Sequence, residues 1–111
     1  MDKEKQIKSE IRKLNKIFEN IPEEKKNLVE GLKENAAFMR VQLKCLQEDV
    51  NENGAIITLK TGNGFEATKE NPSIKNYSVM VGKYATIIKQ LIDLLPEKDT
   101  NSDELLDFIG N

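Results

Sequence analysis

The residue types that could perform chemistry in this sequence are one cysteine, two glycines close together and several adjacent carboxylates. Cys45 lies among apolar residues, where a thiol usually packs as a small hydrophobe and not as a nucleophile. Gly62 and Gly64 lack the Gly-Lys-Ser/Thr continuation of a phosphate-binding loop and are typical of a hairpin turn. The sequence contains no histidine, which removes the commonest general base and the commonest zinc ligand.

The carboxylate pairs Glu23-Glu24, Glu48-Asp49 and Asp103-Glu104 fall at expected helix ends or in polar segments. Solvated or capping groups account for them, since nothing in their surroundings favours a raised pKa. We therefore expect no catalytic residue, no cofactor, no metal site and no enzymatic activity.

Length and charge indicate one small domain. The 111 residues carry 17 basic and 19 acidic groups, a formal charge of −2. A single cysteine excludes an internal disulfide and is consistent with a reducing compartment. Because the chain starts with charged residues and has no long apolar run, we expect no contact with membranes. The expected location is the cytoplasm, which for a viral protein is that of the host cell.

Two helices are predicted in the first half of the chain. Apolar residues recur every three or four positions from Lys3 to Asn20 and again from Pro22 to Asn53. Unbroken, the second helix would be about 48 Å long at 1.5 Å per residue. A compact domain of this size is only about 34 Å across. Either Gly31 interrupts the helix, or the molecule is elongated.

The second half is expected to contain a hairpin and a third helix. The β-branched stretch after Gly54 and the turn-forming glycines predict a β-hairpin at residues 55–67, which must pack on a helix or on a neighbouring subunit. Asn71-Pro72 predicts the start of the third helix, and Pro96 its end. The predicted fold is mainly α: residues 1–96 form a helical, oligomeric protomer with a small hairpin between its second and third long helices. Residues 97–111 are an acidic linker and a short C-terminal docking segment.

The second and third helices carry near-heptad apolar patterns that extend beyond one narrow seam, which predicts homo-oligomerisation. For the tyrosines of this pattern, packing in the core or between subunits is favoured over base stacking. The expected interface consists of Leu43, Leu46, Val50, Tyr77, Val81, Tyr84, Ile88 and Leu91.

A DNA-binding surface is expected on the first helix. Without its acidic end, residues 96–111, the chain carries a charge of +2, so an acidic total does not exclude contact with nucleic acid. Lys5, Arg12 and Lys16 project away from the apolar stripe and are the candidate phosphate contacts. The alternative is that these residues form only the solvated face of an amphipathic helix.

The C-terminal apolar residues Leu105, Leu106, Phe108 and Ile109 have no local partner within their polar surroundings. They either fold back onto the body of the chain or enter a groove on another protein as an amphipathic helix. We expect the second, and assign them as a partner-docking segment.

The order of these elements resembles the small subunits of bacteriophage terminases over residues 22–96. The resemblance is carried by Gly54-Ala55-Ile56-Ile57, Gly64-Phe65, Asn71-Pro72 and Leu91-Ile92-Asp93-Leu94-Leu95-Pro96. It implies a non-enzymatic DNA-packaging factor that assembles as a ring and binds double-stranded viral DNA. It also implies delivery of that DNA to the large terminase subunit, the ATPase and nuclease. The alternative is a helical oligomeric adaptor or phage assembly protein that binds only protein.

Overall fold

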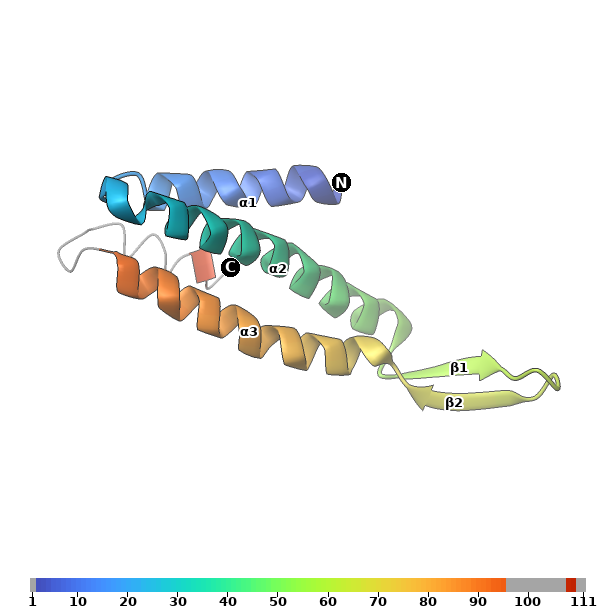
Figure 1. Ribbon diagram of the computed structural model, residues 1–111. Helices are drawn as coiled ribbons and strands as arrows, with labels where there is room; N and C mark the ends of the chain where they lie inside the picture. Colours follow the sequence, from blue (N-terminus) through green and yellow to red (C-terminus); the bar gives the residue numbers. More distant parts are fainter. Residues whose placement is uncertain (1, 96–107, 110–111) are drawn as a thin grey trace.

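The computed structural model describes residues 2–95 and 108–109 and has a mainly α fold, as predicted (Figure 1). Helices α2 and α3 run antiparallel and are joined by a two-stranded hairpin, while α1 packs along α2. The elements in chain order are α1 (Lys3–Ile17), the 3₁₀ turn η1 (Glu23–Lys25), α2 (Lys26–Asn53), β1 (Ile56–Lys60), β2 (Glu66–Glu70) and α3 (Pro72–Leu94).

Helix α1 begins at a side-chain cap and ends earlier than its apolar pattern indicates. The Asp2 carboxylate accepts a hydrogen bond from the Glu4 amide at 3.1 Å. The helix stops at Ile17, before the Asn20 expected from the sequence, and the chain turns so that Phe18 and Ile21 are both buried. Because Ile21 precedes a proline, its backbone disfavours the helical conformation, which separates α1 from the next helical turn.

Helix α2 is continuous through Gly31, which decides between the two expectations for this segment. It starts at Lys26, after η1, and its 28 residues span about 42 Å at 1.5 Å per residue. The molecule is accordingly elongated, with extents of 61 × 25 × 22 Å and a radius of gyration of 18.0 Å. A compact chain of this length would have a radius of gyration of about 13 Å.

The hairpin projects beyond the ends of α2 and α3 (Figure 1). Its strands pair antiparallel from Ile56 opposite Glu70 to Lys60 opposite Glu66, so the second strand reaches past the predicted end at residue 67. The turn closes with the Thr61 amide donating to the Phe65 carbonyl at 2.7 Å. Every residue of β2 is exposed, and the helices therefore do not cover this strand.

Helix α3 has the predicted start. The Asn71 side chain accepts a hydrogen bond from the Ser73 amide at 3.0 Å, and Pro72 occupies the first helical position, where a missing N–H is harmless. The helix ends at Leu94, and Leu95 has extended backbone, as expected for the residue before Pro96.

The core lies where all three helices overlap, at the end of the molecule away from the hairpin. Leu14 of α1, Ala36 of α2 and Leu91 of α3 are each completely inaccessible to solvent. Lys33 links the first two helices at the edge of the core and is 8% exposed. Its ammonium donates to the Asn15 side-chain oxygen at 2.6 Å and pairs with Glu30 at 3.0 Å.

Candidate functional site

The outward face of α1 carries the three residues predicted to bind DNA. Lys5, Arg12 and Lys16 are all exposed, on the side of the helix opposite the buried Leu14 and Ile17. From Lys5 to Lys16 the face extends about 16 Å along the helix axis at 1.5 Å per residue. Within the described part of the chain none of the three basic groups forms an ion pair, so their charges remain available to a ligand.

The composition of α1 strengthens this surface. Its 15 residues include six basic and two acidic groups, a net charge of +4. Lys8 is also exposed, next to the same face. Lys13 differs from the others because its ammonium lies 3.4 Å from Glu10, toward α2. Helix α1 thus has the largest net positive charge of the three helices, and part of this charge lies on its outward face.

The residues predicted to join subunits have different surroundings. Ile88 and Leu91 are 5% and 0% exposed and belong to the core of the protomer, so they cannot meet a second copy in this conformation. This corrects their assignment: the heptad pattern at these two positions reflects packing within one chain. Tyr84 packs against the same core. The predicted interface residues that keep accessible surface are Leu43, Leu46, Val50, Tyr77, Val81 and, in part, Tyr84.

Other apolar side chains are exposed that the sequence analysis did not assign to an interface. They lie on the far side of α2, on α3 and along the hairpin, and Phe65 at the hairpin turn is 72% exposed. The predicted interface did not include them: three lie on the hairpin, outside any helical pattern, and Leu28 continues the near-heptad pattern toward the start of α2. The others are Leu28, Phe38, Ile56, Leu59, Val79 and Ile92.

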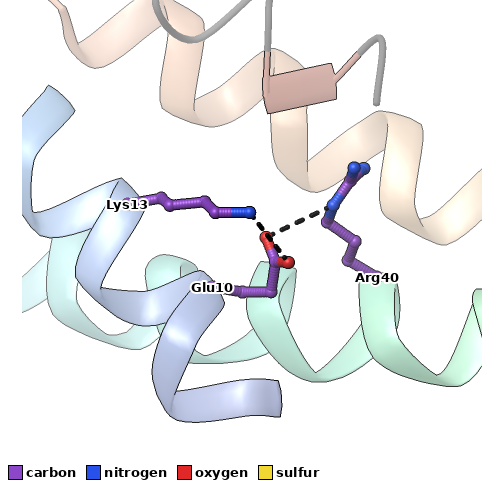
Figure 2. Close-up of polar contacts among 3 residues, drawn as sticks. All are labelled: Glu10, Lys13 and Arg40. Atoms are coloured by element: carbon purple, nitrogen blue, oxygen red, sulfur yellow. Dashed lines mark hydrogen bonds and ion pairs between the residues drawn. The ribbon is translucent and has the colours of Figure 1, made fainter.

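Glu10 connects α1 to α2 through a small ionic network (Figure 2). One of its carboxylate oxygens lies 3.4 Å from the Lys13 ammonium and the other 3.3 Å from the Arg40 Nε. The side chains of Glu10 and Arg40 are each only 17% exposed, so water screens this pair less than a surface pair. Arg40 is thereby held with its guanidinium group pointing away from α1.

The Arg40 guanidinium packs over the Phe108 ring, 4.8 Å from the ring centroid, in a cation–π contact. Phe108 is 6% exposed and part of the core cluster, and Ile109 packs against that cluster. For these two residues the structure agrees with the alternative in which the end of the chain folds back onto the body. Leu105 and Leu106 lie outside the described residues.

Tyr84 lies beside Arg40, on the α3 side of the same region. Burial raises the pKa of the Tyr84 phenol, and the nearby Arg40 charge opposes part of the rise. The buried Tyr84 hydroxyl has no hydrogen-bond partner among the described residues.

A second polar cluster fixes the hairpin to the helices. The Asp49 carboxylate accepts hydrogen bonds from the Ser73 hydroxyl at 2.6 Å, the Asn53 amide group at 2.6 Å and the Asn71 amide group at 3.1 Å. Asn71, 3% exposed, also donates to the Gly54 carbonyl at 3.0 Å. Gly54 has a φ of +86°, which glycine adopts without strain.

These hydrogen bonds hold the pKa of Asp49 below its usual value, Ser73 contributing most. An Asp–Ser pair could belong to a catalytic site, but the sequence contains no histidine to act as the base. The arrangement is that of a structural junction, and sequence analysis predicted only its capping interaction between Asn71 and α3.

Cys45 lies half-buried on α2. In the described part of the chain no three side chains of the metal-ligating types are grouped closely enough to hold an ion. Over the same residues, no helix combines the length and apolar character needed to cross a membrane. Comparisons with protein-family models, with curated proteins and with solved structures found no match to this chain.

Proposed function

We propose that this chain is a non-enzymatic DNA-packaging factor of the phage terminase small-subunit type. It binds double-stranded DNA as a homo-oligomer and recruits the large ATPase and nuclease subunit. The observation that carries the proposal is the outward face of α1, where Lys5, Arg12 and Lys16 lie exposed and unpaired among the described residues. The family resemblance over residues 22–96 supplies the biological setting.

Contacts from this face would reach phosphates. Lysine and arginine on a single exposed stripe neutralise backbone charge and position a protein on DNA, but they do not by themselves read base sequence. With three phosphate contacts per subunit, a plot of the logarithm of the DNA association constant against the logarithm of the salt concentration should have a slope of about −2.7 for each engaged subunit. Affinity from one subunit is small, and several copies presenting the same face would multiply it.

Self-association is supported by the apolar side chains that one protomer leaves uncovered. Phe65 is 72% exposed, Ile56 61% and Val79 53%, on a molecule that is long relative to its width. A lone two-stranded hairpin is marginally stable in water, which favours additional contacts with another copy.

The test is retention of DNA at two salt concentrations by a variant in which Lys5, Arg12 and Lys16 are all replaced by Glu. The matched control replaces Lys75, Lys83 and Lys89, three exposed lysines of α3, and changes the net charge by the same −6. We expect the α1 variant to lose retention at low salt and the α3 variant to keep most of it. Equal losses would indicate an effect of net charge alone.

The exposed apolar surface also favours a second candidate, a helical oligomeric adaptor that binds only protein. The same experiment separates the two functions. An adaptor would assemble normally, but its wild-type form would show no DNA binding that weakens as salt rises. That result, obtained with an oligomeric wild-type protein, would overturn DNA packaging in favour of the adaptor.

A further inference from the structure

The hairpin has two outer edges, and the direction of its backbone hydrogen-bonding groups follows from the ladder. The Asn71 amide donates to the Ala55 carbonyl at 2.8 Å and the Thr61 amide to the Phe65 carbonyl at 2.7 Å, so both pairs occupy hydrogen-bonded positions. Because such positions alternate in an antiparallel ladder, every second residue directs its N–H and C=O groups away from the other strand. These outward residues are Ile56, Thr58 and Lys60 on β1 and Glu66, Thr68 and Glu70 on β2.

The outer edge of β1 is accessible to a further strand. In the described part of the chain the sheet consists of β1 and β2 alone. A hollow of about 510 Å³ is lined by the four consecutive residues 56–59 of β1, together with Asp49, Asn53 and Asn71. Consecutive side chains of a strand point to opposite faces, so all four residues can line one hollow only along the edge of the strand. The whole of β2 is described and contributes no residue to this hollow.

The edge of β2 carries charges that oppose pairing with a second copy. In the antiparallel register centred on Thr68, Glu66 would lie directly opposite the partner's Glu70 at each end of the contact. Like charges at directly opposite positions of two strands are destabilising. Charged side chains on an edge strand are also a common means by which proteins prevent edge-to-edge contacts.

The edge of β1 places no like charges opposite each other when it pairs with itself. In the antiparallel register centred on Thr58, each Lys60 lies opposite the partner's Ile56, and its aliphatic stem can pack there while the ammonium stays in water. On the other face Ile57 lies opposite the partner's Leu59, an apolar cross-strand pair. Leu59 is 44% exposed in the protomer, and this contact would cover part of it.

The width of the molecule favours hairpins that point in opposite directions. Neighbouring strands lie about 4.8 Å apart, so two hairpins paired edge to edge in the same direction would bring their protomers to within about 10 Å. The molecule measures 25 × 22 Å across, and the helical parts would therefore overlap. Antiparallel pairing of two β1 strands instead places the helices at opposite ends, because the hairpin projects beyond them (Figure 1).

The hollow beside β1 has room for the partner's turn. In the register centred on Thr58, the turn of the second hairpin extends past the start of β1, toward the end of α2. The turn residues are Thr61, Gly62, Asn63 and Gly64, none of which has a large side chain.

We propose that the outer edge of β1 is a self-recognition site, at which the β1 strands of two copies pair antiparallel about a two-fold axis at Thr58. The two hairpins then form one four-stranded sheet, and the outward N–H and C=O groups of Ile56, Thr58 and Lys60 are satisfied by the partner. This inference rests on the self-association in the proposed function and specifies its surface. It does not depend on DNA binding.

The test compares the same substitution on the two edges of the hairpin in the full-length chain. Thr58→Pro removes an outward amide of β1 without removing a hydrogen bond between β1 and β2. We expect it to raise the dissociation constant for self-association, measured by analytical ultracentrifugation, by about tenfold or more. Thr68→Pro removes the corresponding amide of β2 and is the matched control, with an expected change of less than about twofold. Equal effects of the two substitutions, with helicity unchanged in circular dichroism, would overturn the proposal.

An exchange of charge at the two-fold axis gives a second measurement that does not depend on proline. Thr58→Glu and Thr58→Lys each place like charges opposite each other, so each variant alone should self-associate more weakly than the wild type. An equimolar mixture should recover association, because glutamate then lies opposite the partner's lysine. The same two substitutions at Thr68 are the control and should leave self-association unchanged. A mixture of the Thr58 variants that associates no better than either variant alone would overturn the two-fold register.

Failure of this contact can be distinguished from failure of the proposed function. A wild type that self-associates and binds DNA in a salt-dependent manner, together with a Thr58→Pro variant of unchanged dissociation constant, overturns only the contact. A wild type that self-associates without salt-dependent DNA binding overturns DNA packaging, while a weakened Thr58→Pro variant still supports the contact. A monomeric wild type would overturn the contact and the self-association together.

Discussion

Leu91 and Val81 belong to the same predicted seam of α3, yet their surroundings differ. Leu91 is fully buried within the protomer, and Val81 remains 39% exposed. We expect Leu91→Ala to lower the free energy of unfolding by about 2–5 kcal/mol, the usual range for a buried leucine that leaves a cavity. Val81→Ala should lower it by less than about 1 kcal/mol. Urea unfolding followed by circular dichroism measures both, and similar losses would contradict this placement of the core.

Asp49 makes the hairpin junction sensitive to acid. Hydrogen bonds from Ser73, Asn53 and Asn71 lower the pKa of Asp49, so its ionised form is favoured in the folded state. That contribution to stability is complete above the ordinary aspartate pKa of about 3.9 and is lost as the pH falls through the lower folded-state value.

We expect Asp49→Asn to melt below the wild type at pH 7, with the difference narrowing as the pH is lowered from about 4 toward 2. Thermal melts at pH 7, 4, 3 and 2 measure the difference. Glu52→Gln, an exposed neighbour on α2, is the control and should show no such narrowing. A constant gap between Asp49→Asn and wild type at every pH would contradict the role given to the ionised carboxylate.

The hairpin contributes little to the protomer core and much to its exposed apolar surface. Leu59 is 44% exposed and Phe65 72%. We expect Leu59→Thr with Phe65→Ser to leave the free energy of unfolding of one protomer within about 0.5 kcal/mol. The mass of the assembly in light scattering should fall, because these side chains are the ones available to a second copy. Thr58→Ser with Thr68→Ser, a cross-strand pair on the hairpin, is the matched control. An unchanged mass in the double variant would place self-association on the helices.

The helices could be located from sequence because their apolar residues repeat with a helical period, and α3 also has a proline at each end. The second strand was harder to delimit, since Glu66–Glu70 contains mainly polar residues, is fully exposed and has no apolar alternation. The end of β2 is set by its pairing with β1, and the sequence of β2 alone gives no information about that pairing. The Glu10–Arg40 pair was likewise not foreseen, because its residues are 30 positions apart and only the packing of α1 on α2 brings them together.

At the scale of the whole molecule, charge and apolar surface lie in different places. The outward face of α1 is basic, the hairpin projects its apolar side chains at the opposite end of α2, and Phe108 is buried against the core under Arg40. This separation would allow one protomer to contact DNA, another copy and a further protein without overlap. It is consistent with either proposed function, since a packaging factor and an adaptor both need several independent surfaces.

Removal of residues 102–111 tests the role of the chain end for the whole molecule. The assignment of these residues as a partner-docking segment implies that the deletion spares folding and removes only partner capture. Because Phe108 is buried, we instead expect the deletion to lower the stability of the protomer. The loss should be about 2 kcal/mol, the order expected when the burial of one large apolar side chain is lost. For a small domain that corresponds to a fall in melting temperature of roughly 8–16 °C.

The matched control is a chain ending at Ile109, which keeps Phe108 and should melt like the wild type. Phe108→Ala in the full-length chain should reproduce most of the loss, because this residue supplies most of the buried surface. If the chain ending at residue 101 melts like the wild type, the burial of Phe108 under the Arg40 guanidinium contributes no stability. Burial of Phe108 against the core would then not oppose its capture by a partner.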